Sequence, residues 1–249
     1  MERGFLRNLS RKNSPEKKIF FIFGTDTGIG KTKICEILIK GFKELGIKAI
    51  PFKPVETGHS RNDKNSDSYK LSEASSLLSP EEISPFFFKR PLAPVLASEM
   101  EGKKIKKEEI VSAIKEMTEK GDLLLVEGAG GILSPISYEF DWLDIVRDLK
   151  GNVLIVIGNR LGAINHALLT ENAIIQRKIK IAGWILNNPS KKRNLAQKTN
   201  LFLLKKFMKS SFIGEVPYFK KSPNKNFCRE IAEKLIPFFS KQGFGERSF

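Results

Sequence analysis

The chain has 249 residues, 41% of them apolar, and a formal net charge of +15. That length supports one sizeable hydrophobic core and leaves little room for a second domain. The apolar runs are far shorter than the roughly 18 residues of a membrane span, and Cys35 and Cys228 are the only cysteines. These features argue against an integral membrane protein, a disulfide framework and a structural zinc site, and they are typical of a cytoplasmic protein.

The basic residues do not form a recognisable surface for reading nucleic acid. They are dispersed over an N-terminal stretch, residues 103–107 and residues 191–193. The interleaved aromatic side chains of a base-stacking platform do not accompany them. We interpret the charge as a lysine-rich solvated surface and expect no specific nucleic-acid partner and no membrane partner.

The two ends of the chain differ in pattern from its middle. Residues 1–18 mix basic and acidic side chains without an apolar signal-peptide core, and residues 241–249 have no helical or strand period. We expect a flexible tail at each end and a single domain over residues 19–240.

Short apolar runs alternate with helical patterns along the domain. The run Ile19–Phe23 predicts a strand buried on both faces, and Gly46 ends the helix that we expect over residues 32–45. Further strands are expected over residues 47–52, 123–126, 153–157, 181–186 and 212–216, and helices over residues 69–78, 105–120, 164–178 and 193–208. This alternation predicts a doubly wound α/β fold, with a mostly parallel sheet and helices on both faces.

A glycine-rich loop joins the first strand to the first helix. Its sequence, GTDTGIGKT over Gly24–Thr32, stands in the strand-to-helix context of a P-loop. Backbone N–H groups of such a loop surround phosphate oxygens, while Lys31 reaches the β- and γ-phosphates and the Thr32 hydroxyl binds Mg²⁺. Five residues, not the usual four, separate Gly24 from Gly30, so the loop is a variant of the motif. It predicts a fold of the P-loop NTPase type.

Three charged residues stand at or near the ends of other strands. Lys53 follows the second strand, where it points toward a nucleotide or is an ordinary exposed lysine. Asp67 belongs to the stretch Asn65–Asp67, whose simplest interpretation is the N-cap of a helix. Glu127 closes the strand over residues 123–126 and precedes glycines, as a Walker-B carboxylate does. Only two histidines are present and no Gly-x-Ser-x-Gly elbow accompanies them, so a hydrolase triad is not expected.

Taken in order, seven short motifs of this sequence resemble those of the dethiobiotin synthetase family. They are Gly24–Thr32 (GTDTGIGKT), Lys53–Gly58 (KPVETG), Asn65–Asp67 (NSD), Val126–Gly131 (VEGAGG), Leu161–His166 (LGAINH), Ala182–Asn187 (AGWILN) and Gly214–Pro217 (GEVP). The resemblance spans residues 19–236. It implies that 7,8-diaminononanoate, CO₂ and ATP are converted to dethiobiotin, ADP and phosphate through a carbamate and a carbamic-phosphoric anhydride.

The resemblance also implies roles for individual residues. Lys31 and Lys53 would be catalytic, Thr32, Asp67 and Glu127 would hold Mg²⁺, and Thr57, Leu161, Gly162 and Asn165 would contact the substrate. The ATP site would comprise Gly28, Ile29, Gly30, Lys31, Thr32, Lys33, Asp67, Glu127, Gly128, Ala129, Gly130, Asn187, Asn188, Pro217, Tyr218 and Phe219. The segment from Leu161 to Asn165 would serve the neighbouring subunit of a homodimer.

A few positions depart from the family pattern. Gly28 stands where a glutamate is common, and no substrate-binding tyrosine is found near Thr199 and Asn200. These departures affect the substrate contacts but not the class of reaction.

Two rival interpretations have a similar ATP-binding core. A partitioning-type ATPase that acts on DNA or membrane usually has a second lysine early in the P-loop, where this chain has Thr25, Asp26 and Thr27. An amidotransferase-type ligase of cobalamin synthesis needs an added glutaminase domain, for which the chain is too short. We therefore favour the synthetase.

Overall fold

A single parallel sheet forms the centre of the molecule in the computed structural model, which describes residues 18–220 and 222–238. Its strands are β1 (Ile19–Gly24), β2 (Ala49–Phe52), β5 (Leu123–Gly131), β6 (Asn152–Gly158), β7 (Ile181–Asn187) and β8 (Phe212–Val216). They run in the order β2-β5-β1-β6-β7-β8, and each neighbouring pair is parallel. The predicted doubly wound α/β fold is confirmed.

The apolar run of β1 is explained by its central position. Successive side chains of a strand point to opposite faces of the sheet. Phe21 and Phe23 accordingly join the core on one face, and Phe20 and Ile22 join the core on the other. Both faces are covered, so no polar position alternates with the apolar ones.

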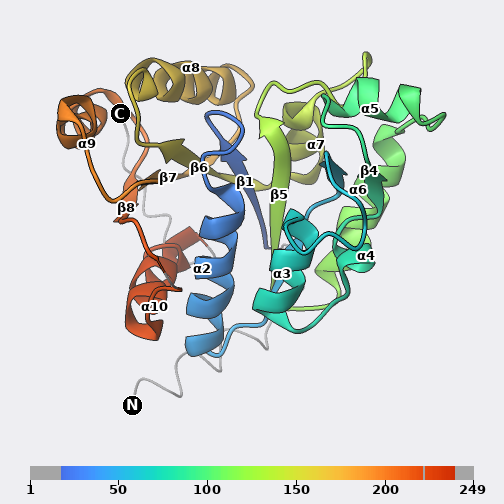
Figure 1. The fold of residues 1–249 in the computed structure, drawn as a ribbon, viewed down its shortest axis with the longest axis horizontal. Helices are drawn as coiled ribbons and strands as arrows, with labels where there is room; N and C mark the ends of the chain where they lie inside the picture. The colour runs from blue at the N-terminus through green and yellow to red at the C-terminus, as the bar shows by residue number, and fades with distance from the viewer. Residues whose placement is uncertain (1–17, 221, 239–249) are drawn as a thin grey trace.

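Helices cover each face of the sheet (Figure 1). One core contains residues of α6 (Lys107–Thr118), α7 (Trp142–Leu149), α8 (Ala163–Gln176) and α9 (Leu195–Phe207). The other contains residues of α2 (Lys31–Glu44), α3 (Asp67–Ser75) and α10 (Lys225–Glu233). None of the helices among the described residues has the length and apolar character needed to cross a membrane.

The segment between β2 and β5 contains small elements that the sequence patterns did not predict. Strands β3 (Val55–Thr57) and β4 (Phe86–Phe88) form a separate parallel pair, and the short helices α4 (Pro80–Ile83) and α5 (Pro94–Met100) flank them. Helices α7 and α10 and the 3₁₀ turn Ile236–Phe238 were also not predicted. The tails expected over residues 1–18 and 241–249 lie, apart from Lys18, outside the described residues, so the domain boundaries stay predictions.

Candidate functional site

A cavity of about 420 Å³ lies where the P-loop meets the C-terminal ends of β2 and β5. In an open parallel sheet this edge forms the ligand crevice, because the loops on the two sides of the switch point diverge. The cavity is lined by Thr27, Gly28, Gly30, Lys31, Thr32, Lys33, Glu36, Lys53, Asp67, Lys70, Glu127 and Gly130. Most of the residues predicted to bind phosphates and metal therefore share one cavity.

The P-loop is held in place by Asn187 at the end of β7. The Asn187 side-chain N–H donates to the carbonyl oxygen of Ile29 at 2.7 Å. Gly30 has φ of 95°, and a Cβ at this position would lie 2.3 Å from Asn187 Nδ2. Only glycine fits both the left-handed backbone and this close approach.

Lys31, the P-loop lysine, is folded back onto its own loop. It is 6% exposed, and its Nζ donates to the carbonyl oxygen of Asp26 at 3.1 Å. Burial lowers the pKa of Lys31, although the nearby Glu127 carboxylate opposes that effect. The side chain lines the cavity and is available to phosphate oxygens there.

Lys53 is buried between two carboxylates. Its Nζ lies 2.5 Å from Asp67 Oδ2 and 2.8 Å from Glu127 Oε1, and the residue is only 4% exposed. Burial by itself would lower the pKa of Lys53, but Glu127, Asp67 and Glu56 outweigh it and raise the pKa. Lys53 is thus a charged group of the crevice, and the alternative of an ordinary exposed lysine is wrong.

Asp67 and Glu127 differ in their surroundings, although they share Lys53. Burial raises the pKa of Glu127, against the opposing effect of Lys53. Burial also pushes up the pKa of Asp67, but Lys53 overcomes it and holds that pKa at about 2. Within Asn65–Asp67, the residue that caps the helix is Ser66, whose side chain accepts the Tyr69 N–H. Asp67 is the first residue of α3.

The oxygen atoms around Lys53 match the chemistry of a hard divalent cation. Thr32 Oγ1 donates to Glu127 Oε1 at 2.9 Å, while Glu127 Oε2 is buried and has no hydrogen-bond partner among the described residues. A buried carboxylate oxygen of this kind can bind an ordered water or a cation, and Mg²⁺ prefers carboxylate, hydroxyl and phosphate oxygens. No group of three or more His, Cys, Asp or Glu side chains suited to a metal occurs in the described ranges. A cation here would therefore also need the Thr32 hydroxyl and nucleotide phosphates.

The glycines after Glu127 serve packing as well as ligand access. Gly128 was expected to allow close approach of a ligand, but a Cβ there would lie 2.2 Å from the Phe23 ring. Gly128 and Ala129 are buried, and Gly130 lines the cavity.

The residues predicted to surround the adenine lie at the ends of β7 and β8. Asn188 is buried and donates to the carbonyl oxygen of Val216 at 3.1 Å. Pro217 and Phe219 are half-buried and Tyr218 is exposed, directly after β8. The Phe219 ring packs against Phe227 at 5.3 Å between centroids. These residues do not line the P-loop cavity, and their contact with a base stays a prediction.

The predicted substrate residues are not among those that line this cavity. Thr57 is half-buried at the end of β3, Leu161 is 82% exposed, and Asn165 is also exposed. Gly162 is the N-cap of α8, with φ of 86°. The segment from Leu161 to Asn165 thus presents a helix N-terminus at the surface.

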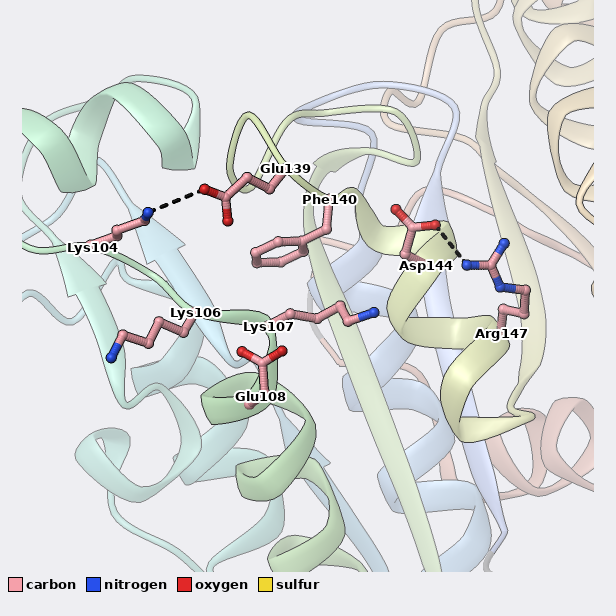
Figure 2. A pocket seen from close by; sticks show the side chains of 8 residues that line it. All are labelled: Lys104, Lys106, Lys107, Glu108, Glu139, Phe140, Asp144 and Arg147. Carbon is pink, nitrogen blue, oxygen red and sulfur yellow. Dashed lines mark hydrogen bonds and ion pairs between the residues drawn. The ribbon is translucent and has the colours of Figure 1, made fainter.

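A second cavity, of about 500 Å³, is larger than the one at the P-loop, but no residue of the P-loop lines it. Figure 2 shows Lys104 directed at Glu139 and Arg147 directed at Asp144. Lys107, which also lines this cavity, pairs with Asp148 at 2.7 Å. Three of its four basic groups are paired with carboxylates, and the same holds for three of the four in the P-loop cavity, so charge pairing does not distinguish the two. The P-loop cavity is the candidate nucleotide site, because the glycine loop and its lysine line it.

Comparison with known proteins decides the family. A family model described as an AAA domain matches residues 18–226. The chain is 40% identical over 224 residues to the ATP-dependent dethiobiotin synthetase of Buchnera aphidicola subsp. Acyrthosiphon pisum (strain 5A), covering 88% of this chain and 98% of that protein. This chain belongs to the dethiobiotin synthetase family. It is also 34% identical to an ATP-dependent dethiobiotin synthetase of Escherichia coli O157:H7, covering 83% of this chain and 93% of that protein.

Solved structures confirm the fold and do not change the family. A plasmid partition protein from Borrelia burgdorferi aligns with a TM-score of 0.57 and 13% identity, covering 91% of this chain and 100% of that chain. The cell division ATPase MinD of Pyrococcus furiosus aligns with a TM-score of 0.52 and 13% identity, covering 89% of this chain and 99% of that chain. At such identity the likeness is one of P-loop fold alone. The sequence relationship separates this dethiobiotin synthetase family member from the partitioning-type ATPases.

Several residues in or near the candidate site were not predicted from the sequence. Glu36 and Lys70 line the cavity, and Arg160 donates a hydrogen bond to the P-loop residue Asp26. Asn200, near the expected tyrosine position, is buried and donates to Asn159 Oδ1 at 2.9 Å. Arg160 and Asn200 had no sequence signal, since their contacts join segments distant in the chain. Glu36 follows the P-loop within α2, and the contacts of Lys70 are with its near neighbours Asn65 and Asp67.

Proposed function

We propose that this chain carries out the reaction of the dethiobiotin synthetase family. ATP, CO₂ and 7,8-diaminononanoate would give dethiobiotin, ADP and phosphate, with ring closure between the two amines. The observation that carries the proposal is the charged cluster of Lys53, Asp67 and Glu127 beside the P-loop, in a chain that shares 40% of its residues with a curated synthetase over nearly that protein's whole length.

This reaction asks the protein for positioning and charge stabilisation more than for proton transfer. One amine captures CO₂ as a carbamate, the carbamate oxygen attacks the γ-phosphorus, and the second amine displaces phosphate from the anhydride carbon. Negative charge develops on oxygen at each step, and fixed cations in a water-poor site stabilise it. In our proposal Lys31 binds the β- and γ-phosphates, and Lys53, kept charged by its carboxylate neighbours, faces the transferring group.

We propose that Thr32, Asp67 and Glu127 hold Mg²⁺ with the nucleotide. The support is their proximity, the unpaired Glu127 Oε2 and the hydrogen bond from Thr32 to Glu127. Bound Mg²⁺ would neutralise charge on the phosphate oxygens. Lys53 contacts both carboxylates, so its charge lies beside the place where these residues would hold the cation.

We also propose a homodimer in which α8 completes the site of the partner. The N-terminus of α8 offers backbone N–H groups that favour an anion, and Leu161 to Asn165 do not line the P-loop cavity of their own chain. Large apolar side chains are exposed on and around α8 and α9, as expected of a surface that another protein covers. They are Leu161, Leu169, Leu195 and Phe202, between 61% and 82% exposed.

A cytoplasmic location agrees with the two cysteines, which are buried and free.

The test of the reaction is the dependence of ADP formation on its substrates. With MgATP present, 7,8-diaminononanoate and bicarbonate are added singly and then jointly, and ADP and dethiobiotin are both measured. We expect turnover only with the two together, because the acceptor of the γ-phosphate is a carbamate made from both. Duplex DNA and anionic liposomes are tested alone as the matched comparison. Stimulation by either of these, without a response to diamine plus bicarbonate, would favour a partitioning-type ATPase and overturn the proposal.

A further inference from the structure

Glu56 is a buried carboxylate that enters the proposed mechanism only as one of the charges that raise the pKa of Lys53. It lies in β3 and is 1% exposed. Its Oε1 accepts the backbone N–H of Asp67 at 2.5 Å, and its Oε2 accepts the backbone N–H of Ser68 at 3.1 Å. One side chain of β3 is thereby bonded to the first two residues of α3.

The Glu56 carboxylate supplies hydrogen-bond acceptors for the first N–H groups of α3. The first N–H groups of a helix have no partner within the helix and carry a positive potential. Ser66 accepts the N–H of Tyr69 at 3.2 Å, and Glu56 accepts the two N–H groups before it. The negative charge of Glu56 is stabilised by those bonds in a place where an unpaired carboxylate would be costly.

The same contact fixes the backbone of Asp67. Asp67 is the first residue of α3, and its own N–H is one of the two groups held by Glu56. Its side chain then reaches Lys53 Nζ at 2.5 Å. The strand that carries Glu56 is itself paired with β4, so the helix start is attached to a small sheet and not to a free loop.

We infer that Glu56 is a positioning residue of the magnesium site. By holding the N-terminus of α3, it keeps the Asp67 carboxylate beside Lys53, within reach of a cation shared with Thr32 and Glu127. This inference rests on the proposed function to the extent that Asp67 is a metal ligand. Groups that orient metal ligands change metal affinity by about 10-fold to 100-fold when they are removed.

The experiment measures metal binding directly, without turnover. Mn²⁺ replaces Mg²⁺, a non-hydrolysable ATP analogue is bound, and free Mn²⁺ is followed by electron paramagnetic resonance. Glu56→Gln keeps the size of the side chain but loses its charge and one acceptor oxygen. We expect it to weaken Mn²⁺ binding by about 10-fold, with a smaller change in kcat once metal is saturating.

Glu171 provides a matched control. It is also 1% exposed, and its carboxylate accepts the backbone N–H groups of Lys209 at 3.0 Å and Ser210 at 2.8 Å. Glu171 lies in α8 and does not line the P-loop cavity. Glu171→Gln should therefore lower thermal stability as Glu56→Gln does, and it should leave Mn²⁺ affinity unchanged.

A double-mutant cycle separates positioning from a direct charge effect. If Glu56 acts through Asp67, Glu56→Gln should have little further effect on Mn²⁺ affinity in an Asp67→Asn background. An equal effect in both backgrounds would overturn the inference. If Glu56→Gln fails to fold, Glu56→Asp takes its place, since the shorter side chain keeps the charge but cannot span both N–H groups.

The outcomes distinguish this inference from the proposed function. Wild-type Mn²⁺ affinity in Glu56→Gln, with weakened binding in Asp67→Asn, would overturn the role of Glu56 and leave the magnesium site intact. Wild-type affinity in Asp67→Asn would overturn both. Weakened binding in Glu56→Gln and Asp67→Asn but not in Glu171→Gln is the result that we expect.

Discussion

Lys53 Nζ lies 2.8 Å from Glu127 Oε1, with the two side chains 5% and 1% exposed. The residues are 74 positions apart and meet because β2 and β5 are adjacent and parallel, so that their C-terminal ends reach the same crevice. Removing one partner of a buried ion pair leaves an uncompensated charge. Substitutions at either residue should therefore be tested for stability as well as for activity.

Lys53→Ala should lower kcat by about 100-fold or more, because a fixed cation that faces developing charge is removed. The measurement is steady-state ADP formation with all substrates saturating, together with a thermal melt to show that the variant is folded. Lys107→Ala is the control, since Lys107 pairs with Asp148 in the other cavity. Unchanged turnover in folded Lys53→Ala would exclude the proposed role.

Asp67→Ala and Glu127→Ala should each raise the Mg²⁺ concentration needed for half-maximal activity and lower the maximum, because the cation loses an oxygen ligand next to the phosphates. The measurement is a Mg²⁺ titration of turnover at fixed ATP. The two variants should differ in stability, since Glu127 is fully buried and the Asp67 side chain is 30% exposed. Full activity of both variants at wild-type Mg²⁺ would refute the metal assignment.

If α8 completes the partner's site, mixing the Leu161→Glu and Lys53→Ala variants should restore activity that each lacks by itself. Leu161→Glu places a negative charge beside the N-terminus of α8, where it should repel a substrate carboxylate. Because Leu161 belongs to the apolar surface that we propose the partner covers, the variant must first be shown to remain a dimer. After subunit exchange with Lys53→Ala, about one quarter of the sites would be intact in a random mixture of C₂ dimers. Light scattering at the assay concentration checks the dimer. No recovery in a mixture shown to contain heterodimers would contradict the composite site.

Asp144→Asn should make the free energy of unfolding depend less on pH in the acidic range. Asp144 and Asp141 form a reciprocal cap at the start of α7, and Arg177 contacts Asp144 at 2.9 Å. Burial pushes the pKa of Asp144 up, but the Asp141 N–H and Arg177 lower it below the usual 3.8. A carboxylate with a lowered folded pKa stabilises the fold above its unfolded pKa and loses that contribution as the pH falls through its folded pKa.

Urea unfolding measures this effect as the free energy of unfolding at several pH values. We expect Asp144→Asn to be less stable than the wild type by about 1 kcal/mol at pH 7. The gap should begin to narrow near the unfolded pKa of 3.8 and close as the pH falls through the lower folded pKa, where the wild-type carboxyl of the folded protein also becomes neutral. A gap that stays constant down to the lowest measurable pH would show that the charge of Asp144 does not contribute.

The sequence was sufficient for the main sheet and for most of the phosphate site. Every strand of the six-stranded sheet was predicted, because buried parallel strands are continuous apolar runs. The three-residue strands β3 and β4 were not predicted, since a run of three residues has no measurable period. Helices α7 and α10 were missed as well, although α3, which is no longer than α10, was predicted.

What the sequence determined by itself is local: a P-loop between a strand and a helix, and charged residues at strand ends. The tertiary structure decided which of these side chains meet. Lys53 could have been an exposed lysine, and only the order β2-β5-β1 places it between Asp67 and Glu127. The bond from Glu56 to α3 and the contact of Gly128 with Phe23 were equally invisible in the sequence. The physical reason is that residue type and spacing encode burial and backbone conformation, whereas contacts between distant segments depend on strand order and on the packing of both faces.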